Sequence, residues 1–208
     1  QDPQNVLGKI ISINLKNKKV EIISLGHRNP QGLYYDDSKN LIFSTEHGPK
    51  GGDEINLNNL NEKGNKNFGW PISSYGDHYP GVKKIHEKNR NLKNFLKTAP
   101  LFKSHKQYGF REPLKYFTPS IGISEIIKLD KKFINENHYS ILATSLNGKS
   151  LYYAKLDENL KIFEDELLFI GNENIKGERM RDLLYIKELN QIFLSFEETP
   201  SIAIMSAK

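Results

Sequence analysis

The chain has 208 residues, with 37% apolar residues, a formal net charge of +5 and no cysteine. This length and composition fit one globular domain or part of one. The missing cysteines exclude disulfides and thiolate metal ligands, and no apolar run approaches the roughly 18 residues that a membrane span needs. The chain opens on Gln1-Asp2-Pro3-Gln4 without an apolar segment, so we expect no signal peptide within it and a true N-terminus further upstream.

The positive charge comes nearly all from lysine, which is spread along the whole chain. That distribution indicates a compositional bias, and because no nucleic-acid-binding motif accompanies it we expect no nucleic-acid partner. The densest basic stretch runs from Lys83 to Lys115. We interpret this stretch as a solvated insertion loop, and a surface for an anionic partner is the alternative.

Short runs rich in β-branched and aromatic residues, typical of strands, begin the chain at residues 9–15 and 20–25. A unit of three such runs then recurs, separated by Asp, Asn, Gly and Pro. A further run, at 162–169, precedes the third unit, and no stretch has a strong helical period. The three units comprise residues 32–37, 41–46 and 54–57, then 123–129, 139–144 and 150–156, then 181–186, 192–196 and 202–205.

Repeated antiparallel units of this kind are typical of propeller blades, so we predict an all-β propeller, with a two-sheet sandwich as the alternative. Residues 61–115 are predicted to interrupt the second unit as a long insertion loop. The units amount to roughly three to four blades, fewer than most closed propellers have, and an open arc exposes strand edges. We therefore expect residues 1–208 to be the C-terminal part of a larger domain, closed by N-terminal blades or by another chain.

Two polar motifs flank one short predicted strand. Arg28-Asn29-Pro30-Gln31-Gly32 precedes this strand, and the Gly- and Pro-rich loop at residues 46–56 follows it. Rigid polar loops on a strand scaffold are frequent locations of binding sites. Because a single short strand joins the two motifs, their polar groups can converge at one end of a sheet.

Arginine is rare in this chain, and three of its five arginines fall in two motifs, at Arg28 and at Arg179 and Arg181. The two-residue spacing of the second motif places its guanidinium groups on one face of a strand. Arginine is favoured where a planar fork binds carboxylate or carbonyl oxygens. The alternatives are that Arg28 only caps a strand, and that Arg179 and Arg181 form ion pairs with Glu178 and Asp182.

Six motifs are spread over nearly the whole chain. They begin with Gln1-Asp2-Pro3 and Leu7-Gly8-Lys9-Ile10, and continue at residues 28–32, 46–56, 67–71, 118–121 and 179–182. Together these motifs resemble the glucose/sorbosone dehydrogenase family. The resemblance implies a six-bladed β-propeller and a soluble quinoprotein that uses pyrroloquinoline quinone (PQQ) and calcium.

The activity implied by this resemblance is the oxidation of an aldose sugar or a related alcohol. Hydride would pass to PQQ, with Ca²⁺ as a Lewis acid and an external electron acceptor. The resemblance also implies a periplasmic or secreted location. The alternative is a non-catalytic propeller that binds a ligand or a protein and has lost the cofactor.

Carried over residue by residue, the resemblance assigns Arg28 to charge stabilisation at the reactive quinone oxygens. The backbone carbonyls of Gly48 and Pro49 would bind calcium, and Asp53 would line the substrate side or orient its neighbours. The remaining implied cofactor contacts are Asn29, Gln31, His47, Thr118, Ser120, Asn147, Lys149, Arg179 and Arg181. For His47 the alternative is a purely structural role.

Two departures from the family pattern concern charge and catalysis. Asn147 stands where many members have a lysine, and Lys149 lies two positions further on. The histidine that serves the family as general base has no match among the six histidines of this chain. We therefore expect the chain to carry much of a PQQ and calcium site but to be inactive alone.

Overall fold

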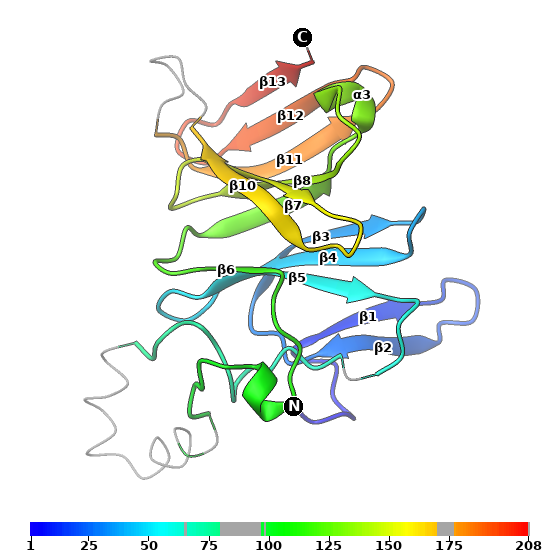
Figure 1. Cartoon of the computed structure of the whole chain (residues 1–208), viewed down its shortest axis with the longest axis vertical. Helices are drawn as coiled ribbons and strands as arrows, with labels where there is room; N and C mark the ends of the chain where they lie inside the picture. Colours follow the sequence, from blue (N-terminus) through cyan, green and yellow to red (C-terminus); the bar gives the residue numbers. More distant parts are fainter. Residues whose placement is uncertain (65, 80–96, 98, 170–176, 208) are drawn as a thin grey trace.

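The computed structural model describes residues 1–64, 66–79, 97, 99–169 and 177–207. It is all-β with little helix, and four antiparallel sheets follow one another in chain order along the long axis of the molecule (Figure 1). Within the described residues, no helix has both the length and the apolar character needed to cross a membrane.

Each sheet is built from strands that are neighbours in sequence. The first pairs β1 (Lys9–Ile13) with β2 (Val20–Leu25). The second has the order β3 (Pro30–Asp36), β4 (Leu41–Glu46), β5 (Asp53–Asn59) and β6 (Lys115–Phe117). The third has the order β7 (Ile123–Lys128), β8 (Tyr139–Ser145), β9 (Leu151–Leu156) and β10 (Ile162–Leu168), and the fourth has β11 (Met180–Ile186), β12 (Gln191–Phe196) and β13 (Ile202–Ser206).

The three predicted units are confirmed as β3–β5, β7–β9 and β11–β13, but two connections differ from the prediction. The run at 162–168 is the outer strand of the second unit, because the turn closed by the Asp157 N–H bond to the Lys161 carbonyl folds it back onto β9. The long segment 61–114 links β5 to β6 within the first unit. β6 is only three residues long, too short for its alternation to be recognised from sequence.

Two hydrophobic cores lie between successive sheets. One contains Phe43, Ile55 and Ile141, and the other contains Met180 and Ile192, all with less than 1% exposure. Strand β8 contributes to both cores, because alternate side chains of a strand point to opposite faces. The β7–β10 sheet is therefore covered on both faces, and its inner strands read as continuous apolar runs in the sequence.

Strands β3, β7 and β11 begin at the same end of the molecule. The Gly32 N–H donates to Thr45 Oγ1 at 2.9 Å, and that hydroxyl donates to the Ser124 carbonyl. Ser124 Oγ in turn donates to the Arg181 carbonyl at 2.5 Å. A Cβ on Gly32 would lie 2.7 Å from the Ser124 carbonyl, so the close approach of β3 and β7 requires glycine there.

Two sheets are joined at the opposite end by Asp36, a carboxylate only 2% exposed at the end of β3. It accepts hydrogen bonds from Ser38 Oγ at 2.6 Å, Tyr139 Oη at 2.7 Å and Lys128 Nζ at 3.0 Å. Burial by itself raises the pKa of Asp36, but these hydrogen bonds and the Lys128 charge lower it to about 2. The ionised form is therefore the stable form in the folded protein.

Replacing Tyr139 by phenylalanine is expected to lower the free energy of unfolding at pH 7 by about 1–2 kcal/mol, because a charge-assisted hydrogen bond is lost. Since the pKa of Asp36 is lower in the folded chain, its stabilisation is present above pH about 4 and is lost as the pH falls toward 2. Urea denaturation between pH 2.5 and 7 measures both effects. Tyr35→Phe, at a tyrosine 50% exposed, is the matched control. An acid dependence unchanged by Tyr139→Phe would contradict this account.

Candidate functional site

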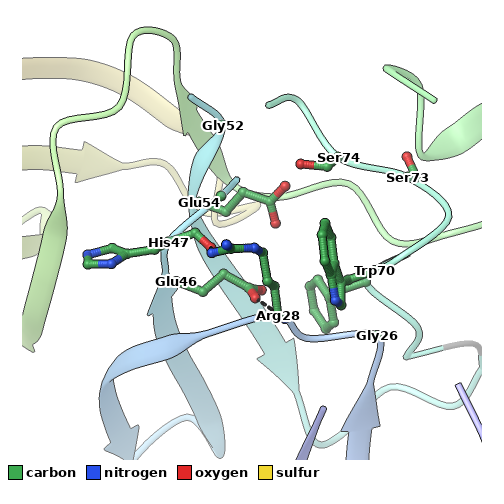
Figure 2. Close-up of a pocket in the computed structure, with 11 residues that line it drawn as sticks. Gly26, Arg28, Glu46, His47, Gly52, Glu54, Trp70, Ser73 and Ser74 are labelled. Atoms are coloured by element: carbon green, nitrogen blue, oxygen red, sulfur yellow. Dashed lines mark hydrogen bonds between the residues drawn. The ribbon is translucent and has the colours of Figure 1, made fainter. Parts of the chain in front are cut away.

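A small polar cleft surrounds Arg28 between β2 and β3. The Arg28 guanidinium donates to the His47 carbonyl at 2.9 Å and lies over the Trp70 ring, with 5.4 Å to the ring centroid. Figure 2 shows the Arg28 side chain between His47 and Trp70, with Glu46 and Glu54 beside it. The predicted approach of the motif at residues 28–32 to the loop that begins at His47 is thus confirmed.

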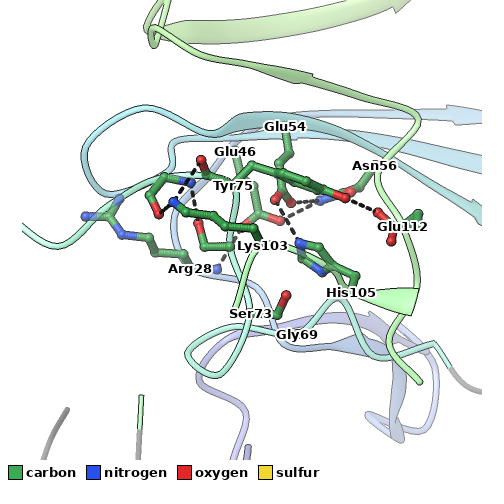
Figure 3. A network of polar contacts seen from close by, with 12 residues as sticks. Arg28, Glu46, Glu54, Asn56, Gly69, Ser73, Tyr75, Lys103, His105 and Glu112 are labelled. Atoms are coloured by element: carbon green, nitrogen blue, oxygen red, sulfur yellow. Dashed lines mark hydrogen bonds and ion pairs between the residues drawn. The ribbon is translucent and has the colours of Figure 1, made fainter. Parts of the chain in front are cut away.

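A buried polar network supports this cleft (Figure 3). Glu46, 4% exposed, accepts hydrogen bonds from the Arg28 backbone N–H at 2.7 Å and from Asn56 Nδ2 at 2.6 Å. His27 Nδ1 lies 3.1 Å from Glu46 Oε1, and the same Asn56 amide lies 3.3 Å from Glu54 Oε2. Glu46 thereby fixes the backbone that carries the Arg28 side chain.

Glu54 lies at the other end of this network and is 5% exposed. Burial raises its pKa, with a further contribution from the charge of Glu46, while the nearby His105 ring acts in the opposite direction. His105 Nε2 lies 3.5 Å from Glu54 Oε1. The sequence places ionisable residues at both ends of the glycine loop, but it has no local signal for His27 and His105 as their partners.

Asp53 organises the loop that follows β4. Its carboxylate accepts hydrogen bonds from the backbone N–H groups of Gly48 at 3.1 Å, Gly122 at 2.6 Å and Ile123 at 3.1 Å. The residue has 0% exposure. Of the two roles expected for Asp53, these contacts fit that of orienting its neighbours, because three backbone donors converge on the carboxylate inside the protein.

The glycine loop also rests on a turn of the long 61–114 segment. Lys50 and Asp77 exchange backbone hydrogen bonds of 3.0 and 2.8 Å. Lys103 Nζ donates to the carbonyls of Tyr75 and Gly76 and forms an ion pair with Asp77 Oδ1 at 2.9 Å. This part of the predicted insertion loop thus supports the site, whereas the basic residues at 83–93 lie outside the described residues.

The backbone carbonyl oxygens of this loop are ligands of the kind that a hard cation binds. Among the described residues, no hydrogen bond reaches the carbonyl oxygens of Gly48 or Pro49. Calcium prefers oxygen ligands of this kind. His47 Nε2 is buried without a hydrogen-bond partner in the described part of the chain. The described residues contain no group of three or more His, Asp or Glu side chains that could hold a metal ion.

A second group of cations lies at the start of β11. One carboxylate, Glu197, accepts from Arg179 Nε and from Arg181 NH2, each at 2.7 Å. The two guanidinium groups thus meet at one carboxylate, although Arg179 lies just before the first residue of β11. The acidic partner of both is Glu197, whereas the alternative had named Glu178 and Asp182. Glu178 instead accepts from Thr199 Oγ1 at 2.6 Å. Hydrogen bonds from Arg181 and Arg179 hold the pKa of Glu197 below its usual value.

The other predicted site residues lie at this same end of the sheets, in loops or, for Gln31, at the start of β3. Lys149 Nζ lies 3.3 Å from Glu198 Oε1, and Asn147 Nδ2 donates to the Ser120 carbonyl at 3.3 Å. Gln31 Nε2 donates to Asn29 Oδ1 at 3.0 Å, and Thr118 is exposed. Arg28 and His47 therefore share one cleft, while Lys149 and the arginine pair form a second group on the neighbouring sheets.

The described histidines other than His47 do not line the cleft around Arg28. His27 and His105 belong to the buried network, His78 Nε2 lies 3.0 Å from the Ala99 carbonyl, and His138 packs against Phe163. His86 lies outside the described residues. That the general base is missing from this chain stays a prediction.

The chain is all-β, with sheets that follow one another in sequence order. At the end where β3, β7 and β11 begin, it carries a group of cationic side chains and the backbone carbonyl groups of the glycine loop. A family model described as "Glucose / Sorbosone dehydrogenase" matches residues 1–201. The chain belongs to this family.

Two curated relatives have related names. The chain is 28% identical to "Aldose sugar dehydrogenase YliI" of Escherichia coli strain K12, covering 79% of this chain and 38% of the relative. It is 27% identical to "Quinoprotein glucose dehydrogenase B" of Acinetobacter calcoaceticus, covering 93% of this chain and 48% of the relative. The chain therefore spans less than half the length of these proteins.

A solved structure supports the fold. The apo form of the soluble aldose sugar dehydrogenase of Escherichia coli superposes with a TM-score of 0.70 at 24% identity, covering all of this chain and 57% of that structure. At this level of identity the likeness concerns the fold alone, and it agrees with the propeller-type arrangement of the sheets.

Proposed function

We propose that this chain supplies part of a PQQ- and calcium-dependent oxidoreductase that oxidises an aldose sugar or a related alcohol. The observation that carries the proposal is the placement of Arg28, Lys149, Arg179 and Arg181 at one end of three successive sheets. This placement lies next to a loop in which the Gly48 and Pro49 carbonyls accept no hydrogen bond among the described residues, and it suits a flat polyacidic cofactor held with a cation.

The chemistry of the donor set fits PQQ and Ca²⁺. When bound, PQQ supplies the hydride acceptor and Ca²⁺ polarises its reactive carbonyl. The Gly48 and Pro49 carbonyls would hold the ion, and the Arg28 guanidinium, fixed by His47 and Trp70, would stabilise negative charge that develops on the nearby oxygens. The remaining cofactor contacts would come from Asn29, Gln31, His47, Thr118, Ser120, Asn147, Lys149, Arg179 and Arg181.

The complete domain in this proposal is a six-bladed propeller, of which this chain provides roughly three to four blades. The remaining blades, from an upstream segment or another chain, would close the ring and supply the general base. Residues 1–208 alone would be inactive. An external acceptor would reoxidise the cofactor, and the protein would act in the periplasm or after secretion.

A non-catalytic propeller that binds a ligand or a protein is the second candidate. It is favoured by Asn147 at the position of a family lysine, and by the carboxylates of Glu197 and Glu198, which already neutralise three of the cations. In this case the fold would persist without cofactor chemistry.

Reconstitution distinguishes the two candidates. We expect the full-length gene product, mixed with PQQ and Ca²⁺, to show the altered absorbance of the bound quinone and to reduce an artificial electron acceptor when an aldose is added. Residues 1–208 alone should give no turnover. A full-length protein that leaves the quinone spectrum unchanged at saturating Ca²⁺ would contradict the enzyme proposal and favour the binding propeller.

A further inference from the structure

The turn after β12 carries acidic residues opposite the basic residues of the proposed site. Glu197 bridges Arg179 and Arg181 with two contacts of 2.7 Å, and the Glu197 backbone N–H also donates to the Arg179 carbonyl at 2.9 Å. The turn is held in place by Thr199, whose hydroxyl donates to Glu178 at 2.6 Å. Glu178 is only 9% exposed, so this anchor is part of the folded structure.

Among the described residues, Glu197 is the partner of only one N–H donor on each guanidinium, and most donors of the two arginines have no partner there. Arginine has five N–H donors, and Arg179 and Arg181 each give one of them to Glu197. Both side chains are partly exposed, at 34% and 43%, so their remaining donors are accessible to a ligand. Two neighbouring cations also repel each other, and the carboxylate that they share offsets this repulsion by attracting both.

We infer that Glu197 is a positioning residue that holds the two guanidinium groups as one preformed receptor for a carboxylate of the bound ligand. The inference rests on the proposed function and adds to it a residue with no assigned role. A long arginine side chain loses rotamer freedom when it binds, and a shared partner removes part of this cost before the ligand arrives. The Glu197 carboxylate also competes with the ligand for the N–H donors of the two arginines. This competition is the smaller effect, because the free donors outnumber the two that Glu197 uses.

The test is a PQQ titration of the full-length gene product with Ca²⁺ present, followed by the absorbance of the bound quinone. We expect Glu197→Ala and Glu197→Gln to weaken PQQ binding about tenfold, because a neutral amide accepts from one guanidinium and presents its own N–H donors to the other. Glu188→Gln, at an exposed residue in the turn at the other end of the same hairpin, is the matched control and should bind like wild type.

A double-mutant cycle separates positioning from a general effect on the fold. In an Arg179→Gln, Arg181→Gln background, Glu197→Gln should have little further effect on PQQ affinity, and thermal unfolding should show that all variants fold. Unchanged binding by Glu197→Gln, tighter binding, or equal losses in both backgrounds would each overturn the inference. A wild-type protein that binds no PQQ would overturn the proposed function, and this inference with it.

Discussion

Replacing Arg28 by lysine is expected to lower the turnover number of the cofactor-loaded, full-length protein by about 100-fold or more, as removal of one preorganised donor to a developing oxyanion does in other enzymes. Lysine keeps the charge but loses the planar fork that reaches the His47 carbonyl at 2.9 Å while lying over Trp70. The two groups that fix the direction of the cation would no longer do so.

Steady-state kinetics with an artificial acceptor measures this effect, and thermal unfolding shows whether the variant folds. Arg111→Lys is the matched control, because Arg111 forms a surface ion pair with Glu62 at 2.8 Å on the long 61–114 segment. Turnover by Arg28→Lys within a factor of two of wild type would exclude the role assigned to Arg28.

Replacing Asp53 by alanine is expected to lower the free energy of unfolding by about 3–5 kcal/mol, which is a large part of the stability of a typical domain. The carboxylate has 0% exposure and accepts from three backbone N–H groups, of Gly48, Gly122 and Ile123. Without it, these buried donors lose their acceptor. Because they belong to the glycine loop and to the start of β7, the loop should also lose its fixed geometry.

Urea denaturation of the same protein preparation provides the measurement. Asp53→Asn is the second variant, since one amide oxygen can still accept while the amide nitrogen opposes a backbone donor, and it should lose about half as much stability. Asp37→Ala, at an exposed turn position, serves as control. A loss below about 1 kcal/mol for Asp53→Ala would show that the hydrogen bonds to this carboxylate contribute little net stability.

The polar network beside Arg28 explains why the two substitutions with the largest expected effects, at Arg28 and at Asp53, lie close together in the structure. Glu46 holds the Arg28 backbone, and Asp53 holds the loop that presents the His47 carbonyl to the Arg28 side chain. One carboxylate therefore acts on each side of the same contact. The chain concentrates buried polar groups here, where they are costly unless paired, because the pairing specifies one geometry.

The arginine pair shows how far sequence reasoning about the site extends. The spacing of Arg179 and Arg181 predicted a shared strand face, and both guanidinium groups do meet one carboxylate. The nearby acids Glu178 and Asp182 were the expected alternative partners. The actual partner, Glu197, is distant in sequence and reaches the arginines only because β11 and β12 form a hairpin whose register places it there.

The sequence by itself determined the strands, the repeat of three runs per sheet, the membership of the polar motifs in one family and the residue types of a cationic, carbonyl-lined site. These properties depend on alternation, turn residues and short motifs, which are local. Only the tertiary structure decided that β10 completes the third sheet, that the 61–114 segment supports the glycine loop, and that Asp53, His105 and Glu197 orient other groups. The physical reason is that buried polar groups must find partners, and those partners are chosen by how the sheets pack and not by their distance along the chain.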